Sequence, residues 1–114
     1  LVFLLSSGYV LSEPDPTTYF RDRAIIGAGI YYTGEKSVLL ISINGDLSGI
    51  NDCAKSVSRF VINSDSPHYK EMVSIAMTAY VSGQQRVDLY TENNCDIYGG
   101  AQTLLGIKMG DITW

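Results

Sequence analysis

The sequence predicts a mainly β fold that contains one helix, with the element order β-β-β-α-β-β. Three observations lead to this prediction. Five short runs are rich in β-branched and aromatic residues, which favour strands. One longer stretch repeats apolar residues at three- and four-residue spacing, as an amphipathic helix does. The chain has 114 residues, of which 46% are hydrophobic and 18% charged, and this is the size and composition of one small domain.

The N-terminal residues are expected to lie outside this domain. Residues 1–12 begin with the apolar run LVFLL and continue with small residues, so that Val10 and Ser12 occupy positions −3 and −1 of a cut before Glu13. This order is typical of the end of a secretory signal peptide, and we expect a signal-peptide remnant and a secreted or periplasmic protein. A first β-strand is the alternative. Two prolines follow, so residues 13–24 are expected to form an N-terminal arm and residues 25–114 the folded domain.

The first three strands are expected before the helix. Residues 25–33 and 37–43 are separated by Gly-Glu-Lys and predict a hairpin. Both faces of the second run carry apolar side chains, so this strand is expected to be covered on both sides. Residues 44–52 are rich in turn-forming Asn, Asp, Ser and Gly and predict a loop. Residues 57–62 predict the third strand.

The loop after the second strand partly matches a calcium-binding loop. The first, third, fifth, sixth and ninth positions of an EF-hand pattern would be Asn44, Asp46, Ser48, Gly49 and Asp52. The twelfth position is Lys55, where the pattern requires a bidentate Glu. Neither flank has a helical pattern. A plain loop between strands is therefore the preferred interpretation.

The helix is expected between the third and fourth strands. Ser66 is a suitable N-cap, Pro67 suits the first helical position, and Gly83 suits a left-handed C-terminal stop. The apolar stripe between them predicts a face that packs on the core; its members are Tyr69, Met72, Val73, Ile75, Ala76, Met77, Ala79 and Tyr80. The opposite face carries few charges after the first turn. This face is either an ordinary exposed helix surface with short side chains or a contact with another subunit.

Two further strands are expected after the helix, over residues 86–91 and 103–109. Five short strands with one helix between the third and the fourth have the element order of an oligonucleotide/oligosaccharide-binding barrel. The sequence therefore predicts a small five-stranded OB-like barrel, whose closure would leave no exposed sheet edge.

The two cysteines are expected to pair with each other. Export compartments oxidise cysteines, and a small domain gains stability from a covalent bond, so an even pair predicts a Cys53–Cys95 disulfide. Two buried free thiols, or a thiol that binds a metal or acts in catalysis, are the alternatives.

Composition argues against catalysis and against nucleic acid. The net charge is −4 and the basic residues are scattered, which disfavours binding to nucleic acid or to anionic lipid. The single histidine, His68, is expected to be exposed at the start of the helix, and no nucleophile or phosphate-binding motif accompanies it. We expect no enzyme, no metal, no cofactor and no transmembrane segment. A small hydrolase that uses His68 is a third, less favoured hypothesis.

Binding is the function class that the residues favour. The chain has eight tyrosines, whose flat apolar face and hydroxyl suit both sugar rings and protein contacts. Tyr31, Tyr90 and Glu92 are the candidate ligand-binding residues, and ordinary sheet positions are the alternative for each tyrosine.

The stretch from Tyr69 to Cys95, YKEMVSIAMTAYVSGQQRVDLYTENNC, and the later LLGIKM resemble a known family. They are similar to the binding (B) subunits of bacterial toxins with one A and five B subunits, of the subtilase-cytotoxin, typhoid-toxin and pertussis-toxin type. They also resemble small secreted gammaproteobacterial proteins of unknown function. The resemblance covers residues 25–109.

The resemblance implies a homo-pentamer of barrels that binds host glycans, with helices lining a central pore and a separate enzymatic A subunit as partner. In the subtilase and typhoid subunits a serine holds sialic acid, and its place is taken here by Ala24. That pocket is therefore not implied for this chain. The leading hypothesis is a secreted, non-catalytic module that binds a host glycan or a partner protein, as a homo-oligomer. The second is a monomeric secreted or periplasmic protein, such as an inhibitor or accessory protein.

Overall fold

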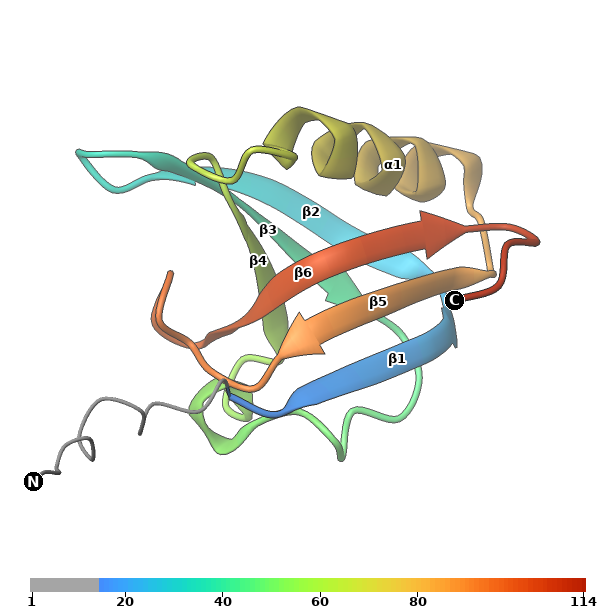
Figure 1. Cartoon of the computed structure of the whole chain (residues 1–114), viewed down its shortest axis with the longest axis horizontal. Helices are drawn as coiled ribbons and strands as arrows, with labels where there is room; N and C mark the ends of the chain where they lie inside the picture. Colours follow the sequence, from blue (N-terminus) through green and yellow to red (C-terminus); the bar gives the residue numbers. More distant parts are fainter. Residues whose placement is uncertain (1–14) are drawn as a thin grey trace, which may run out of the picture.

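The computed structural model describes residues 15–114 (Figure 1). The signal-peptide remnant expected over residues 1–12 lies outside these described residues. Within them, the elements in chain order are β1 (Thr17–Arg23), β2 (Ile25–Tyr32), β3 (Ser37–Ile43), the short 3-10 helix η2 (Asp52–Ala54), β4 (Arg59–Asn63), α1 (Tyr69–Ser82), β5 (Val87–Glu92) and β6 (Ala101–Met109).

The strands form one sheet in the order β1-β5-β6-β4-β3-β2. Neighbouring strands are antiparallel, except that β4 and β6 are parallel. The predicted mainly β, OB-like fold is confirmed. Some details of the prediction are wrong. The described residues form six strands rather than five, and α1 follows the fourth strand rather than the third. The expected barrel is also not closed, since β1 and β2 are the two edges of the sheet.

The additional strand is β1. Residues 13–24 were expected to form an arm, but Thr17–Arg23 pairs with β5 along its length. Phe20 is buried and its neighbour Tyr19 is exposed, which is the alternation of a half-buried strand. The nearby prolines and three consecutive charged residues, Arg21 to Arg23, hide this short alternation in the sequence.

A sharp bend separates β1 from β2. Asp22 has a positive φ of 55°, which a non-glycine residue adopts rarely. Asn44 holds the other side of the bend: its side-chain Oδ1 accepts a hydrogen bond from the Ala24 amide (2.8 Å), and its own amide donates to the Ala24 carbonyl (3.1 Å). A single residue, Ala24, therefore lies between the two edge strands.

The main core lies between the curved sheet and α1, which covers one side of the molecule (Figure 1). Phe20 from β1 and Phe60 from β4 meet there edge to face, with 5.1 Å between ring centroids. A second, smaller core on the other side of β3 and β4 contains Val38, Val61 and Ala101. Val38 is buried in this second core while Leu39 is buried in the main one, so β3 is covered on both sides as predicted.

Helix α1 begins later than predicted. Ser66 does not cap it: the Ser66 hydroxyl accepts a hydrogen bond from the His68 amide, and the Ser66 carbonyl accepts one from the Tyr69 amide, so these residues form a turn before the helix. The N-cap is His68, whose side chain makes no capping hydrogen bond. The predicted stop at Gly83 is confirmed, with φ 67° and its amide bonded to the last turn. Most of the predicted stripe packs on the core, but Tyr80 is exposed.

The predicted disulfide is confirmed. Cys53 in η2 and Cys95 in the loop after β5 are bonded, with 6.1 Å between their Cα atoms, across 42 positions of sequence. The bond holds the loop between β5 and β6 against the loop between β3 and β4. Closure of a loop of this length removes enough entropy from the unfolded chain to stabilise the fold by about 4 kcal/mol at most.

We expect the Cys53→Ser, Cys95→Ser double variant to fold and to lose up to about 4 kcal/mol of unfolding free energy in urea titrations, because its unfolded chain is less constrained. Reduction of the wild type with dithiothreitol should give the same loss. The same reductant should leave the double variant unchanged, which serves as the control. Equal stability of the oxidised wild type and the double variant would contradict this prediction.

Candidate functional site

The three candidate ligand-binding residues lie in two different places. Tyr90 and Glu92 are on β5, where the buried Thr91 between them points into the protein and both of them point outward. Tyr31 is on β2, and β2 and β5 are not neighbours in the sheet. The structure therefore brings Tyr90 and Glu92 to one face and assigns Tyr31 to another surface.

Tyr90 belongs to a group of three rings on the outer face of β1, β5 and β6. We call Tyr19, Tyr90 and Trp114 the outer aromatic cluster. The ring centroids of Tyr19 and Tyr90 are 4.8 Å apart, and those of Tyr19 and Trp114 are 6.0 Å apart. Tyr19 is 44% exposed and Trp114 is 43% exposed. The cluster therefore presents aromatic surface to solvent.

An ionic cluster lies beside these rings. Asp88 on β5 is almost completely buried and accepts hydrogen bonds from the Asp22 backbone amide (2.9 Å) and from the Arg21 side chain (3.2 Å). Lys108 on β6 lies 3.1 Å from the same carboxylate. The Arg21 guanidinium also lies 4.3 Å from the centroid of the Tyr19 ring. Asp88 thus links β5 to both of its neighbours, β1 and β6. It also fixes Asp22, the residue with the positive φ.

These contacts determine the charge state of Asp88. Burial alone would raise its pKa, but the hydrogen bond from the Asp22 amide and the contacts with Lys108 and Arg21 outweigh this effect and hold the pKa below its ordinary value. The carboxylate is therefore ionised at neutral pH.

Tyr31 belongs to a second aromatic group, over the smaller core. Its ring lies edge to face with Tyr98, with 5.5 Å between centroids. The Arg59 guanidinium lies 5.5 Å from the Tyr98 ring and donates a hydrogen bond to the Gly99 carbonyl. The Arg59 Nε atom is buried and has no hydrogen-bond partner among the described residues. This group combines two tyrosines with one cation.

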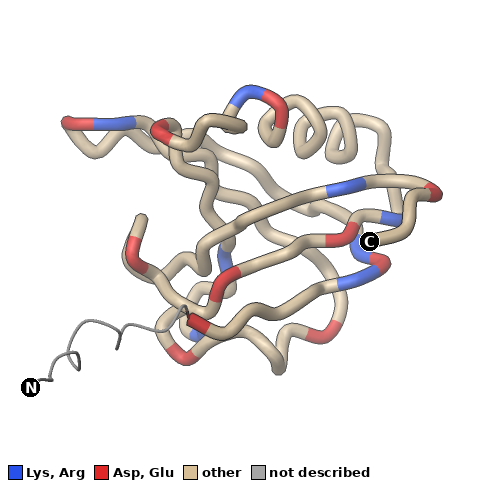
Figure 2. Tube along the Cα trace, in the orientation of Figure 1, with Lys and Arg blue, Asp and Glu red and all other residues tan. Residues whose placement is uncertain are grey.

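A third surface lacks charge altogether. Residues 25–32 of β2 and residues 72–82 of α1 contain no charged side chain, and Figure 2 shows the charges of α1 confined to its first turn. We call these two stretches, apart from Tyr31, the uncharged surface. Several of its large apolar side chains are exposed, including Ile26, Ile30, Tyr32, Tyr80 and Val81. Tyr31 belongs instead to the second aromatic group, with Tyr98.

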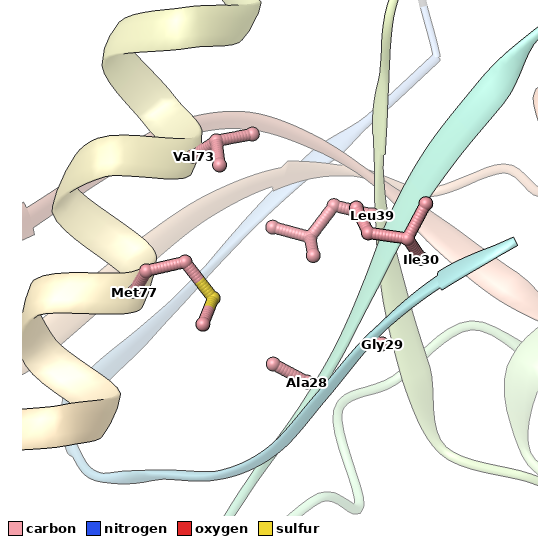
Figure 3. Close-up of a pocket in the computed structure, with 6 residues that line it drawn as sticks. All are labelled: Ala28, Gly29, Ile30, Leu39, Val73 and Met77. Atoms are coloured by element: carbon pink, nitrogen blue, oxygen red, sulfur yellow. The ribbon is translucent and has the colours of Figure 1, made fainter.

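A cleft lies in the uncharged surface, between α1 and β2. It is lined by Ala28, Gly29, Ile30, Leu39, Val73 and Met77, and Figure 3 shows Val73 and Met77 projecting from the helix toward the strands. Every lining residue is apolar. The lining has no titratable group that could move a proton, and the cleft suits an apolar contact.

Metal-binding groupings are not found among residues 15–114. No group of three or more His, Cys, Asp or Glu side chains there could hold a metal ion. His68 is exposed at the start of α1, as expected. In the part of the chain that the structure describes, no helix is long and apolar enough to cross a membrane.

The comparisons with known proteins give fold relatives only. No protein-family model and no curated protein matches the sequence. Among solved structures, the chain is similar to a mutant of the Salmonella typhi PltB homopentamer with Neu5Ac-alpha-2-3-Gal-beta-1-4-GlcNAc glycans, at 17% identity and a TM-score of 0.60. It is also similar to a second mutant of this homopentamer, at 19% identity and a TM-score of 0.62. Each likeness covers 83% of this chain and 86% of the other.

The PltB likeness supports the B-subunit-like fold that the sequence resemblance implies. At this level of identity it shows the fold and does not transfer a ligand or an assembly. Ala24, which takes the place of the sialic-acid serine in the resemblance, is buried at the bend between β1 and β2.

The sequence did not single out Tyr19, Arg21, Lys108 or Trp114 as neighbours of Tyr90. Tyr19 and Arg21 lie on β1, so they could be placed beside Tyr90 only if β1 had been predicted as a strand. The exposed-buried-exposed alternation of Tyr-Phe-Arg is the sequence signal for that strand. Trp114 lies beyond the last strand and reaches the cluster by a turn at Gly110, which has a φ of 81°. No pattern in the sequence predicts against which strands the segment after β6 packs.

We expect Asp88→Asn to destabilise the protein at neutral pH, because Arg21 and Lys108 would lose their counter-charge. Since the pKa of Asp88 is lowered in the folded state, its contribution is present above the ordinary carboxyl pKa and is lost as pH falls through the lowered one. Urea titrations from about pH 7 to about pH 2 should show the difference between variant and wild type shrinking in acid. A difference that stays constant with pH would contradict this prediction, and the exposed Asp65→Asn variant is the control.

Proposed function

We propose that this protein is a secreted or periplasmic, non-catalytic binding subunit that assembles with copies of itself, as a homo-pentamer, and binds host glycans. The observation that carries the assembly is the uncharged surface of β2 and α1. The glycan ligand is supported by the shared fold and by the exposed aromatic clusters.

In the part of the chain that the structure describes, β2 is an edge of the sheet with no strand paired to its outer side. Edge strands of monomeric proteins usually carry charges, prolines or covering segments, because their free N–H and C=O groups can pair with another chain. The other edge, β1, carries three consecutive charges, Arg21 to Arg23, whereas the eight residues of β2 carry none. The contrast indicates that β2 pairs or packs with a partner and β1 does not.

Helix α1 extends this partner surface. Val81 is 81% exposed and Ile30 on β2 is 61% exposed, and neither contributes to the core. Met77 lies between them, since it lines one hollow with Ile30 and another with Val81. Extended apolar exposure of this kind is unusual on a monomer and marks interaction sites. A second copy of the chain is the partner that the shared fold favours, because the similar solved structures are homopentamers.

The glycan ligand is proposed on separate grounds. A mutant of the PltB homopentamer was solved with sialylated glycans. Tyr31, Tyr90 and Glu92 remain the proposed ligand-binding residues of this chain, on two surfaces that do not coincide with the cleft. An enzymatic A subunit is a further proposed partner, because the resemblance to toxin binding subunits implies one.

Light scattering coupled to size-exclusion chromatography tests the assembly. We expect wild type to elute with the mass of five chains and Ile30→Lys to shift toward the mass of one, because the buried charge would be unpaired. Ile112→Lys is the matched control, since Ile112 is 57% exposed outside the uncharged surface. A single-chain wild type would exclude the homo-oligomer and favour the monomeric inhibitor or accessory protein. An Ile30→Lys variant that keeps the wild-type mass would exclude this interface.

A glycan array tests the ligand class. We expect the assembled wild type to bind a restricted set of glycans, because several copies displayed on one ring raise the avidity of weak single sites. The same protein denatured before application is the control. A confirmed oligomer that binds no glycan would favour a protein partner instead.

A further inference from the structure

The outer aromatic cluster has the shape of an open corner. The rings of Tyr19 and Tyr90 are inclined by only 32° and form a floor. The Trp114 ring stands at 60° to Tyr19 and at 75° to Tyr90, so it forms a wall beside this floor. Two aromatic faces that meet at a steep angle can contact a flat ligand from below and from one side.

The absence of a side chain at Gly106 sets the position of the wall. A Cβ atom built at Gly106 would lie 3.3 Å from the Trp114 ring and 3.7 Å from the Tyr90 side chain. The Trp114 ring therefore rests directly on the backbone of β6, next to Tyr90. Lys108 approaches the same ring from the strand, with its Nζ atom 5.8 Å from the centroid.

The side chains beside the outer aromatic cluster are polar, and their charges nearly cancel. Arg21 lies against Tyr19 and is about half exposed, so its guanidinium has donors free for a ligand. Asp88 balances one of the two cations, Arg21 and Lys108, and the neighbouring Arg86 is paired with Asp111. One positive charge among these five residues remains unbalanced, and Glu92 lies on the same face as Tyr90 with the opposite charge. This arrangement does not select for a ligand with several negative charges.

We infer that the outer aromatic cluster and Arg21 bind a neutral pyranose residue, which places its apolar C–H face on Tyr19 and Tyr90 and its edge against Trp114. This inference rests on the proposed function and specifies one of its two candidate surfaces. A pyranose ring offers an apolar face together with hydroxyls at its rim, and the cluster offers aromatic faces together with donors at its rim. An apolar peptide side chain would leave those rim donors without partners.

Trp114 makes the inference directly measurable, because it is the only tryptophan in the chain. The probes are methyl β-galactoside and the neutral disaccharide N-acetyllactosamine, added to the assembled wild type while tryptophan emission is recorded. We expect a saturable shift of the emission to shorter wavelength, since the sugar removes water from the exposed ring. Mannitol, an open-chain polyol, is the control for non-specific effects.

Variants separate the two aromatic surfaces. We expect Tyr90→Leu, which keeps an apolar side chain but loses the ring, to weaken binding of N-acetyllactosamine about tenfold in calorimetry. Trp114→Leu should weaken it similarly, and it provides a second test at a position outside every strand. Tyr31→Leu tests the other candidate surface, and a larger loss of binding in it than in Tyr90→Leu would overturn the inference. His68→Ala is the control, because His68 is exposed at the start of α1 and belongs to neither aromatic group; this variant should bind the disaccharide as the wild type does.

The outcomes distinguish this inference from the proposed function. If the array shows glycan binding but the emission stays constant and Tyr90→Leu binds normally, the inference is wrong and the proposed function stands. Loss of binding in Tyr31→Leu alone would likewise assign the ligand to the other surface. If no glycan binds the assembled protein, both are wrong.

Discussion

The fold depends on the bend at residues 22–24, which lets one continuous stretch of chain supply both edges of the sheet. Asp88 fixes the bend from one side through the Asp22 amide, and Asn44 fixes it from the other through Ala24. Asp22 adopts a backbone conformation that is costly for aspartate, and these hydrogen bonds compensate for that cost. Because β1 pairs with β5 and β2 pairs with β3, the bend wraps the sheet around the buried Phe20 and Phe60.

The same bend separates two surfaces with different chemistry. The β1 side presents cations and the outer aromatic cluster around Asp88. The β2 side presents the uncharged surface together with α1 (Figure 2). A subunit that binds both other copies of itself and a ligand needs two separate surfaces, so that one contact does not block the other. The proposed function assigns assembly to the β2 side and, by the further inference, sugar binding to the β1 side.

Local patterns predicted most of the fold, and long-range contacts account for what they missed. The hairpin of β2 and β3, the stop at Gly83 and the Cys53–Cys95 bond follow from residue types at short range or from an even pair of cysteines. Strand β1 was missed because its alternation is short and its charged end is stabilised by Asp88, far away in sequence. The outer aromatic cluster was missed for the same reason, since it joins β1, β5 and the C-terminal Trp114. Of the three predicted ligand residues, only Tyr90 lies in it.

Hydrogen exchange of the β2 backbone amides, followed by mass spectrometry over a range of protein concentrations, tests most directly whether this edge is an interface between copies. Within residues 15–114, no strand pairs with the amides of β2 that face away from β3. If copies assemble through this edge, those amides and the exposed turns of α1 become protected as concentration rises, while the β1 edge does not change. Exchange of β2 that is fast and independent of concentration, in a protein that is nevertheless folded, would contradict the account.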